Sequence, residues 1–424
     1  MDLILRGVLG ISLFYGVAWA ISENRSKIDV KTVLLGLAVQ VPLAFLLTKW
    51  GVLDGVFSGV TGAVIALRDA TITGTSFVFG YLGDNKVPFM MKPGANEASS
   101  TFIFALQALP MIIVVNALSM LLFYFKVIPV IVRVLSHVFE RLLKLGGALG
   151  LCTSAELFLG QTEAPLLIKP YLEKLTRGEL FTVMALGMAT SSIPAMILYS
   201  GILIDIIPNN MTHIFAALIL NIVTVLTLSR IMVPSEKDTK ADDVSSPYKF
   251  SGAMDAISQG TMDGMTIFAS VVAIIMVFVA LIALINKFLA FLVASHLFPM
   301  VGGEVPTLEM LLSYVMAPVV WLMGISWGEA FIAGKLFAMK TVLNEIIAYL
   351  DFANNPGVLS AKGQFIMTYV LCSFANFSSV GIQIAGFGVM VPKRREEIIS
   401  LSYKALGAGI LASCITGALV GLFV

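Results

Sequence analysis

Residues 152–167 read C-T-S-A-E-L-F-L-G-Q-T-E-A-P-L-L and place two carboxylates, a glycine and a proline in a segment that is otherwise apolar enough for a bilayer. An ionisable side chain at bilayer depth costs roughly 2.5 to 3.5 kcal/mol on insertion scales, so it should face protein or a water-filled cavity. Non-helical backbone is tolerated there only where protein or cavity water satisfies it. The pattern therefore predicts a re-entrant loop, with Glu156 and Glu163 as candidates for a functional site.

The composition around this loop is that of a polytopic membrane protein. Of the 424 residues, 58% are hydrophobic and only 12% are charged, against about 25% charged residues in soluble domains. The formal net charge of +1 gives no basic excess that would favour nucleic acid as a partner. The three cysteines are an odd number in apolar segments and the three histidines are far apart. We therefore expect no disulfide framework, no metal cluster and no cofactor.

Apolar runs of about 20 residues, the length needed to cross a bilayer, recur along the whole chain. They lie near residues 3–22, 31–49, 103–125, 181–206, 212–233, 265–286, 365–390 and 403–424. Two amphipathic pieces, near 54–68 and 127–146, are predicted to lie at the membrane interface. If eight spans alternate, the clusters of lysine and arginine fall on one side, which the positive-inside rule makes cytoplasmic. Both termini are then expected outside, and the polar segment 234–251 becomes a cytoplasmic linker.

Two apolar segments, near residues 148–175 and 306–345, are too broken to span, and each is predicted to form a re-entrant hairpin. The tip of the second is expected near Gly324 and Gly328, beside Glu329, because glycine permits a tight turn. An odd number of predicted spans separates the two segments. The hairpins should therefore enter the membrane from opposite faces.

An internal repeat links the two hairpins. The pair Thr162-Glu163 precedes a Thr-Ser-Ser run at 190–192, and the pair Asn344-Glu345 precedes the run Asn-Phe-Ser-Ser at 376–379 at similar spacing. With opposite points of entry the repeat is inverted, as in secondary transporters whose substrate site lies near the midplane. The expected fold is all-α, with about eight transmembrane helices, two re-entrant helical hairpins in an inverted repeat and interfacial helices.

The helix after each hairpin carries polar residues at mid-membrane depth. These residues are Ser191, Ser192 and Pro194 in the first, and Asn376, Ser378 and Ser379 beside Gly381 in the second. Proline removes a backbone donor and glycine weakens a helix, so both segments are predicted to be unwound and to offer backbone groups to a ligand or ion. Alternatively, the hydroxyls bond back to their own helix or join neighbouring helices.

Three motifs, in this order, resemble the signatures of the concentrative nucleoside transporter family in its bacterial form. They are G-Q-T-E-A-P-L-L (Gly160 to Leu167), N-E-I-I-A-Y (Asn344 to Tyr349) and S-F-A-N-F-S-S-V-G (Ser373 to Gly381). The resemblance covers almost the whole chain, including G-T-S-F-V-F-G (Gly74 to Gly80) and V-P-K-R-R (Val391 to Arg395). It implies an ion-coupled nucleoside importer in contact with membrane lipid, in the inner membrane of a bacterium.

The resemblance also implies a homotrimer in which a scaffold holds a mobile transport domain that moves by an elevator-like displacement. The scaffold would comprise residues 1–125 with 252–290 packed on them. The first transport repeat would be 126–233 and the second 291–424, with 234–251 as the linker between the two halves.

Carried over position by position, the resemblance assigns a substrate site. Gln161, Thr162 and Glu163 would meet the base, while Glu345, Asn376 and Ser379 would hold the ribose. Phe374 would line the sugar pocket, and Ala195 stands in the region where relatives have an aliphatic contact to the base. The chemistry agrees, because an amide offers the donor and acceptor that a base edge needs and carboxylates accept from ribose hydroxyls.

One departure from the family pattern bears on the coupling ion. Sodium-coupled members resemble one another in an asparagine five residues before the glutamine, completed by oxygens of the broken helix; this chain has Glu156 there, with Thr190 and Ser191 in the helix. Glu156 could load and release a proton, bind Na⁺ as a hard oxygen ligand, or be a buried partner for a lysine or a backbone amide. Proton coupling is favoured slightly over sodium.

Two rival functions remain at this stage. An inverted-repeat carrier could take another small polar solute, although an anionic one would demand lysine or arginine in the hairpins, and none stands within a few residues of Glu163 or Asn376. An intramembrane enzyme could use Glu163 and Glu345 as an acid/base pair. It would lack a histidine, metal cluster or activated nucleophile nearby, so we expect no enzymatic activity.

Overall fold

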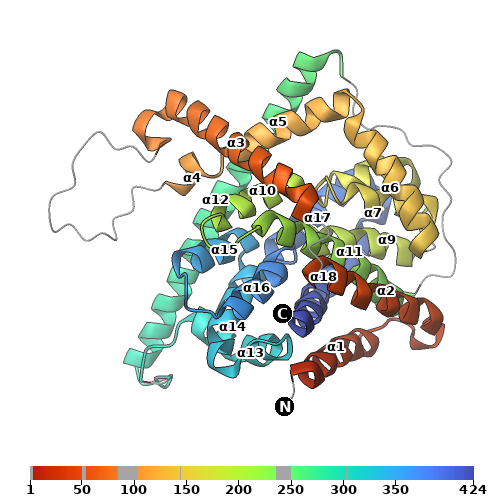
Figure 1. Cartoon of the computed structure of the whole chain (residues 1–424). Helices are drawn as coiled ribbons and strands as arrows, with labels where there is room; N and C mark the ends of the chain where they lie inside the picture. Colours follow the sequence, from red (N-terminus) through yellow and green to blue (C-terminus); the bar gives the residue numbers. More distant parts are fainter. Residues whose placement is uncertain (1–2, 50–53, 85–102, 144, 235–249, 302) are drawn as a thin grey trace.

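The computed structural model describes residues 3–49, 54–84, 103–143, 145–234, 250–301 and 303–424 (Figure 1). Over these residues the protein is helical, apart from an isolated bridge between Val301 and Glu304. The predicted all-α fold class is therefore confirmed for the described part of the chain. The predicted linker 234–251 lies almost entirely outside the described residues.

The helices follow one another along the chain with short connections. The first half contains α1 (Leu3–Ala20), α2 (Val30–Lys49), α3 (Asp54–Phe79), α4 (Phe104–Gln107), α5 (Met111–Tyr124), α6 (Val127–Leu143), α7 (Gly147–Ala155), the 3₁₀-helix η3 (Ala164–Ile168), α8 (Lys169–Leu172), α9 (Arg177–Ala189), α10 (Ile193–Leu203) and α11 (Asn210–Met232). The second half contains α12 (Ala253–Ala294), α13 (Leu308–Leu322), α14 (Trp327–Val342), α15 (Glu345–Asn354), α16 (Ala361–Leu371), α17 (Phe377–Met390) and α18 (Arg395–Phe423).

Five described stretches are long and apolar enough to cross a membrane. They are Phe104–Tyr124, Arg177–Leu203, Asn210–Met232, Ala253–Ala294 and Pro392–Phe423. The pair α13 and α14, bent by 116°, would make a sixth. Helices α1, α2 and α17 are apolar but shorter, and the run predicted as one span at 365–390 is divided into α16 and α17. The count of eight spans stays a prediction.

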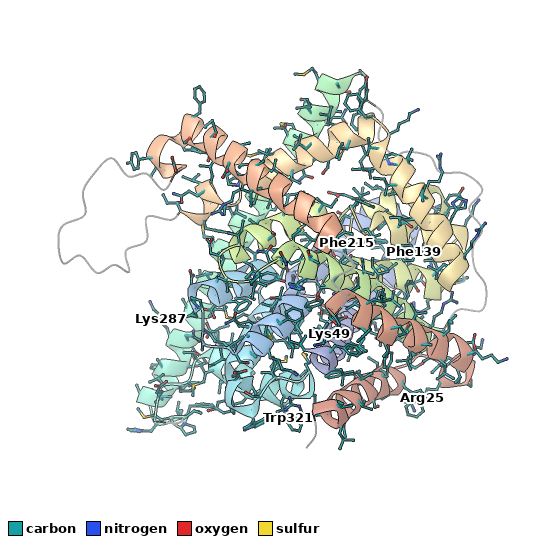
Figure 2. The ribbon with its side chains drawn as sticks, in the orientation of Figure 1. Arg25, Lys49, Phe139, Phe215, Lys287 and Trp321 are labelled. Carbon is teal, nitrogen blue, oxygen red and sulfur yellow. The ribbon has the colours of Figure 1, made fainter. Side chains whose placement is uncertain are left out.

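Amphipathic helix α6 lies along the outside of the protein, as its sequence pattern indicates. Ile128 and Val132 are buried against the core, whereas Arg133 and Arg141 are exposed. The other predicted amphipathic piece, at 54–68, is only the first part of the longer helix α3. Side chains of the outer layer such as Arg25, Lys49 and Lys287 lie on the periphery of the molecule (Figure 2).

Helices α9, α11 and α18 form the centre of the protein and are buried on nearly all sides. Helix α1 packs on the end of α18, where a Cβ added to Gly7 would collide with Leu422, so the two ends of the described chain lie together (Figure 1). Helix α12 packs along α5, and Gly260 allows its backbone to approach that of Asn116 closely. The rest of α12 presents apolar side chains outward, among them Leu284 and Phe288.

The second hairpin differs from the sequence prediction in the position of its tip. Gly324 does form a turn, with φ of +109°, but Glu329 caps the next helix: its carboxylate accepts from the backbone N–H (3.0 Å) and hydroxyl (3.1 Å) of Ser360. Helix α14 then runs on to Val342, and the break that reaches the cavity described below is Leu343–Asn344. The turn signal of the glycines was stronger in the sequence than that of the Asn344 cap.

Candidate functional site

A cavity of about 180 Å³ lies where the two repeats meet. The tip of the first hairpin, the start of α10, the junction of α14 and α15, and the start of α17 form its wall, and α12 closes one side through Ile267 and Val271. Its polar lining residues are Gln161, Thr162, Glu163, Ser192, Tyr199, Asn344, Glu345, Asn376, Ser378 and Ser379. Polar groups from both halves of the sequence therefore converge on one apolar-walled space, as in small-molecule binding sites.

Glu345 is the most firmly held group in this cavity. Its Oε1 accepts from the hydroxyl of Tyr199 at 2.8 Å, and its Oε2 accepts from Nδ2 of Asn376 at 2.8 Å. The Tyr199 ring is itself fixed by stacking on Tyr349, with centroids 4.9 Å apart. Each carboxylate oxygen keeps a second lone pair, so Glu345 can still accept from a ligand hydroxyl.

Two asparagines organise the backbone on this side. Asn344 caps α15 by accepting from the N–H of Ile347 at 2.9 Å, and Asn376 caps α17 by accepting from the N–H of Ser379 at 2.8 Å. A helix begins with unsatisfied N–H groups, and an asparagine at the cap satisfies one of them. The same bond fixes the Asn376 amide so that its N–H₂ faces Glu345.

The predicted unwinding of both helices is confirmed. The chain leaves helical geometry at Thr190–Ser192, between α9 and α10, and at Cys372–Asn376, between α16 and α17. The two breaks contact each other, because the N–H of Phe374 donates to the carbonyl of Thr190 at 2.9 Å. Asn221 on α11 donates to the free carbonyl of Cys372 at 3.1 Å. Gly381 lies inside α17, beyond the break.

The tip of the first hairpin is packed tightly but leaves its polar atoms open. Glu163 accepts from the N–H of Gly160 at 3.1 Å, while Oε1 of Gln161 is buried with no partner among the described residues. A Cβ on Gly187 would lie 2.7 Å from that of Gln161, so only glycine allows α9 to come this close. Gly386 on α17 approaches Thr162 in the same way. An unsatisfied buried acceptor invites a donor from a ligand.

Glu156 lies behind the tip, outside the lining of the cavity. Its Oε2 is 2.8 Å from the hydroxyl of Thr190, which is also 2.8 Å from the carbonyl of Leu186 and donates to one of them at a time. Its Oε1, like the hydroxyl of Thr153, is buried without a partner in the described parts of the chain. Ser191, expected beside this carboxylate, places its hydroxyl 3.6 Å from Sγ of Cys372.

The eight residues predicted to bind substrate all line the cavity: Gln161, Thr162, Glu163, Ala195, Glu345, Phe374, Asn376 and Ser379. The sequence analysis missed the contributions of Tyr199 and Asn344 and the apolar wall from α12. Tyr199 could have been found, since it stands one helical turn after Ala195 and therefore faces the same way. The α12 wall carries no polar signal in the sequence.

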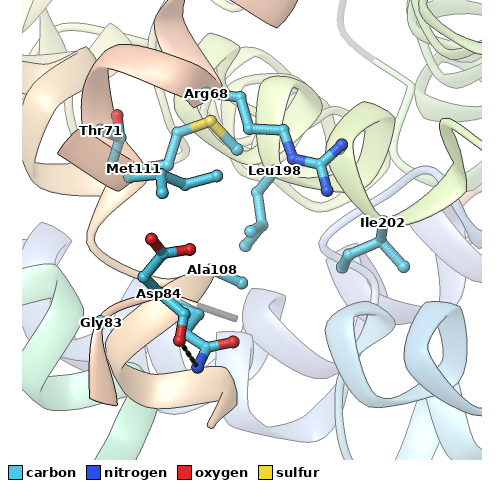
Figure 3. Close-up of a pocket in the computed structure, with 11 residues that line it drawn as sticks. Arg68, Thr71, Gly83, Asp84, Ala108, Met111, Leu198 and Ile202 are labelled. Carbon is cyan, nitrogen blue, oxygen red and sulfur yellow. Dashed lines mark hydrogen bonds between the residues drawn. The ribbon is translucent and has the colours of Figure 1, made fainter. Parts of the chain in front are cut away.

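A second cavity, of about 120 Å³, lies between α3, α5 and α10 (Figure 3). Arg68, Asp84, Met111 and Ile202 contribute to its lining, and Leu198 of α10 faces both cavities. No residue of either hairpin lines it, so it lacks the paired carboxylates of the first cavity. We therefore take the first cavity as the candidate site.

Comparison with known families and proteins gives consistent matches along the chain. The family model described as Na⁺ dependent nucleoside transporter C-terminus matches residues 213–421, the corresponding N-terminus model matches 9–82, and a nucleoside recognition model matches 105–206. The uncharacterized transporter YutK of Bacillus subtilis is 34% identical, over 99% of this chain and 100% of its own length. The nucleoside permease NupC of Helicobacter pylori is 29% identical, over 99% and 98%.

Solved structures agree with these matches. The transporter CNTnw in an inward-facing substrate-bound state superposes with a TM-score of 0.87 at 29% identity, over 100% of this chain and 98% of that one. Variants of the same transporter in outward-facing and intermediate states superpose with TM-scores of 0.87 and 0.86.

Proposed function

This chain belongs to the concentrative nucleoside transporter family, and on that premise we propose that it is a cation-coupled symporter that imports nucleosides. Membership of a transporter family removes the intramembrane enzyme from the alternatives. The observation that carries the proposal is the cavity between the repeats, where Glu345 is held by Tyr199 and Asn376 and still has acceptor capacity. A fixed carboxylate suits the hydroxyls of a ribose.

We propose that the two repeats divide the nucleoside between them. Glu345, Asn376 and Ser379 hold the ribose, with Phe374 beside the sugar, while Gln161, Thr162 and Glu163 meet the base and Ala195 forms an apolar contact with it. In support, the polar atoms of repeat two are already bonded to one another, whereas Oε1 of Gln161 is open to a donor from the base.

For the coupling ion we propose a proton carried by Glu156. The charge of a buried carboxylate is costly unless it is paired, and one oxygen of Glu156 lacks a partner within the described structure. A proton at that oxygen would neutralise the group, and the Thr190 contact would remain. Sodium stays the alternative, because Glu156, Thr190 and Thr153 offer the hard oxygens that such a cation prefers, and the matching family models are described as Na⁺ dependent.

One coupled cation is enough to concentrate a neutral nucleoside. A single positive charge crossing 100 mV supplies about 2.3 kcal/mol, which corresponds to roughly fifty-fold accumulation. We further propose an elevator-type movement of both repeats against α3, α5 and α12, in a homotrimer of a bacterial inner membrane. Superposition on inward-facing, intermediate and outward-facing forms of one transporter supports a fold that moves between such states.

The proposal is tested by uptake of labelled uridine and adenosine into proteoliposomes under separately imposed pH and sodium gradients. We expect accumulation driven by a pH gradient without sodium. Glu156→Gln should abolish uphill uptake and leave exchange of internal for external nucleoside intact, because the neutral amide cannot change its protonation. Glu173→Gln, which removes a surface carboxylate paired with Lys393, is the matched control. Strict sodium dependence of the wild type, or accumulation by Glu156→Gln, would contradict proton coupling.

A further inference from the structure

Lys340 is a buried cation to which the proposed transport mechanism gives no role. It lies on α14 and its side chain is fully buried. Its Nζ donates to the hydroxyl of Ser413 on α18 at 3.3 Å, and that hydroxyl lies 2.9 Å from the hydroxyl of Ser373 at the break of the second repeat. The ring of Phe337 is 5.6 Å from Nζ. Among the described residues, Lys340 has no carboxylate in ion-pair contact.

A buried ammonium needs compensation by a negative charge, since removal from water costs several kcal/mol per ion. The carboxylate whose charge interacts with Lys340 is Glu345, five residues further along the chain and across the Leu343–Asn344 break. The other titratable groups around Lys340 are the thiols of Cys372 and Cys414. Tyr199, Tyr349 and Cys372 are the remaining titratable groups around Glu345. None of these four groups is a carboxylate or a base.

The hydrogen bonds of Glu345 require it to be ionised. Both of its oxygens face donors: the hydroxyl of Tyr199 and the amide N–H₂ of Asn376. The Asn376 amide cannot turn round, because its oxygen accepts from Ser379 N–H and the Ser378 hydroxyl. A proton on Oε2 would therefore point at another donor. The geometry is built for a carboxylate in a place where a lone negative charge would be unstable.

We propose that Lys340 is a positioning residue for the sugar subsite: its fixed charge keeps Glu345 ionised, so that Glu345 accepts from ribose hydroxyls. This inference rests on the proposed nucleoside function. Without the cation, the buried carboxylate takes up a proton as the pH falls, its bond from Asn376 is lost and it accepts fewer hydroxyls. Lys340 then sets ribose selectivity and the pH range over which it holds, without touching the substrate.

The test is equilibrium binding of uridine and of its 2′- and 3′-deoxy analogues to the purified full-length protein, from about pH 5 to about pH 8. The ratio of ribonucleoside to deoxynucleoside affinity is the readout, because protonation of Glu156 affects both ligands alike and cancels. Lys340→Met keeps the apolar stem and removes the charge. Lys335→Met is the matched control, five residues earlier on the same helix, where the lysine pairs with Asp351 at 3.2 Å on the surface.

We expect Lys340→Met to lower the ribose preference by at least about tenfold, with the loss growing as the pH falls, while Lys335→Met follows the wild type. Lys340→Arg, which keeps the charge, should restore part of the preference. An unchanged, pH-independent ratio in Lys340→Met overturns this inference but leaves the nucleoside function standing. Absence of nucleoside binding by the wild type overturns both.

A second variant guards against a merely structural effect. In a Glu345→Gln background the negative charge is already gone, so adding Lys340→Met should leave ribose selectivity unchanged. A further loss of selectivity in the double variant would show that Lys340 acts independently of Glu345 and would overturn the inference.

Discussion

The two hairpin regions resemble each other in sequence but differ in how their polar atoms are satisfied. In repeat two, Glu345 is bonded through both oxygens, and Asn344 and Asn376 each cap a helix. In repeat one, Glu163 accepts from a backbone N–H, while oxygens of Gln161 and Glu156 have no partner within the described residues. One half of the site is preorganised and the other half is incomplete.

This difference matches the two parts of a nucleoside. The ribose is common to all of them, so a rigid subsite with fixed acceptors can bind it with little loss of side-chain freedom. The base and the coupling ion vary in their hydrogen-bonding needs, and open acceptors in repeat one allow them to complete the site. The following predictions are ordered from the largest expected effect to the smallest.

Glu345→Gln should cause the largest loss. An amide at this position would direct its N–H₂ group at Tyr199 or Asn376, which are both donors in the native arrangement. Breaking one partner of a buried charged pair costs about 3 to 5 kcal/mol, so we expect nucleoside affinity to fall at least about a hundredfold. Glu329→Gln is the control, since that carboxylate caps α16 away from the cavity. Equal losses in the two variants would refute the special place of Glu345.

Gly187→Ala should have an intermediate effect, on the incomplete half alone. The added Cβ would lie 2.7 Å from Cβ and 3.0 Å from Cα of Gln161 and must displace the tip of the first hairpin. Misplacement of a binding group by a fraction of an ångström reduces binding, and we expect a loss of about tenfold. Gly407→Ala on α18, which meets no atom within 4 Å, makes the same helix-favouring change harmlessly. Binding that is unchanged in Gly187→Ala would show that the tip is not held by this contact.

The sequence predicts the polar half of this comparison far better than the apolar half. Gln161, Glu163, Glu345 and Asn376 could be located because a polar residue in an apolar run needs a reason. The end of the second hairpin could not, because the turn at Gly324 carried the stronger local signal and Asn344 is recognised as a helix cap only once α15 is known. Closure of the site by α12 depends on packing between segments more than a hundred residues apart, which local patterns do not contain.

The smallest effect is expected outside both regions, at Glu23. It accepts from Arg177 at 2.8 Å and from Lys404 at 2.5 Å, and the Arg177 guanidinium holds the pKa of this carboxyl at about 2, below its ordinary 4.5. Because the folded-state pKa is the lower one, the stabilisation is complete above pH 4.5 and is lost as the pH falls toward 2. For a partly exposed pair it amounts to at most about 1 kcal/mol.

Thermal unfolding of wild type and Glu23→Gln at several pH values checks this prediction. The wild type should have the higher Tm at neutral pH, and the difference should disappear in acid. Nucleoside selectivity should be unchanged. A Tm difference that persists in acid would mean that the charge of Glu23 is not its source.

The division of the nucleoside between the repeats is tested most directly by selectivity in two matched variants, Gln161→Leu in repeat one and Ser379→Ala in repeat two. Affinities for uridine, adenosine and their deoxy analogues should show that Gln161→Leu changes the preference between bases and leaves the preference for ribose intact. Ser379→Ala should do the reverse. If each variant weakened all four ligands by the same factor, or if the two effects were exchanged, the two-part site would be contradicted.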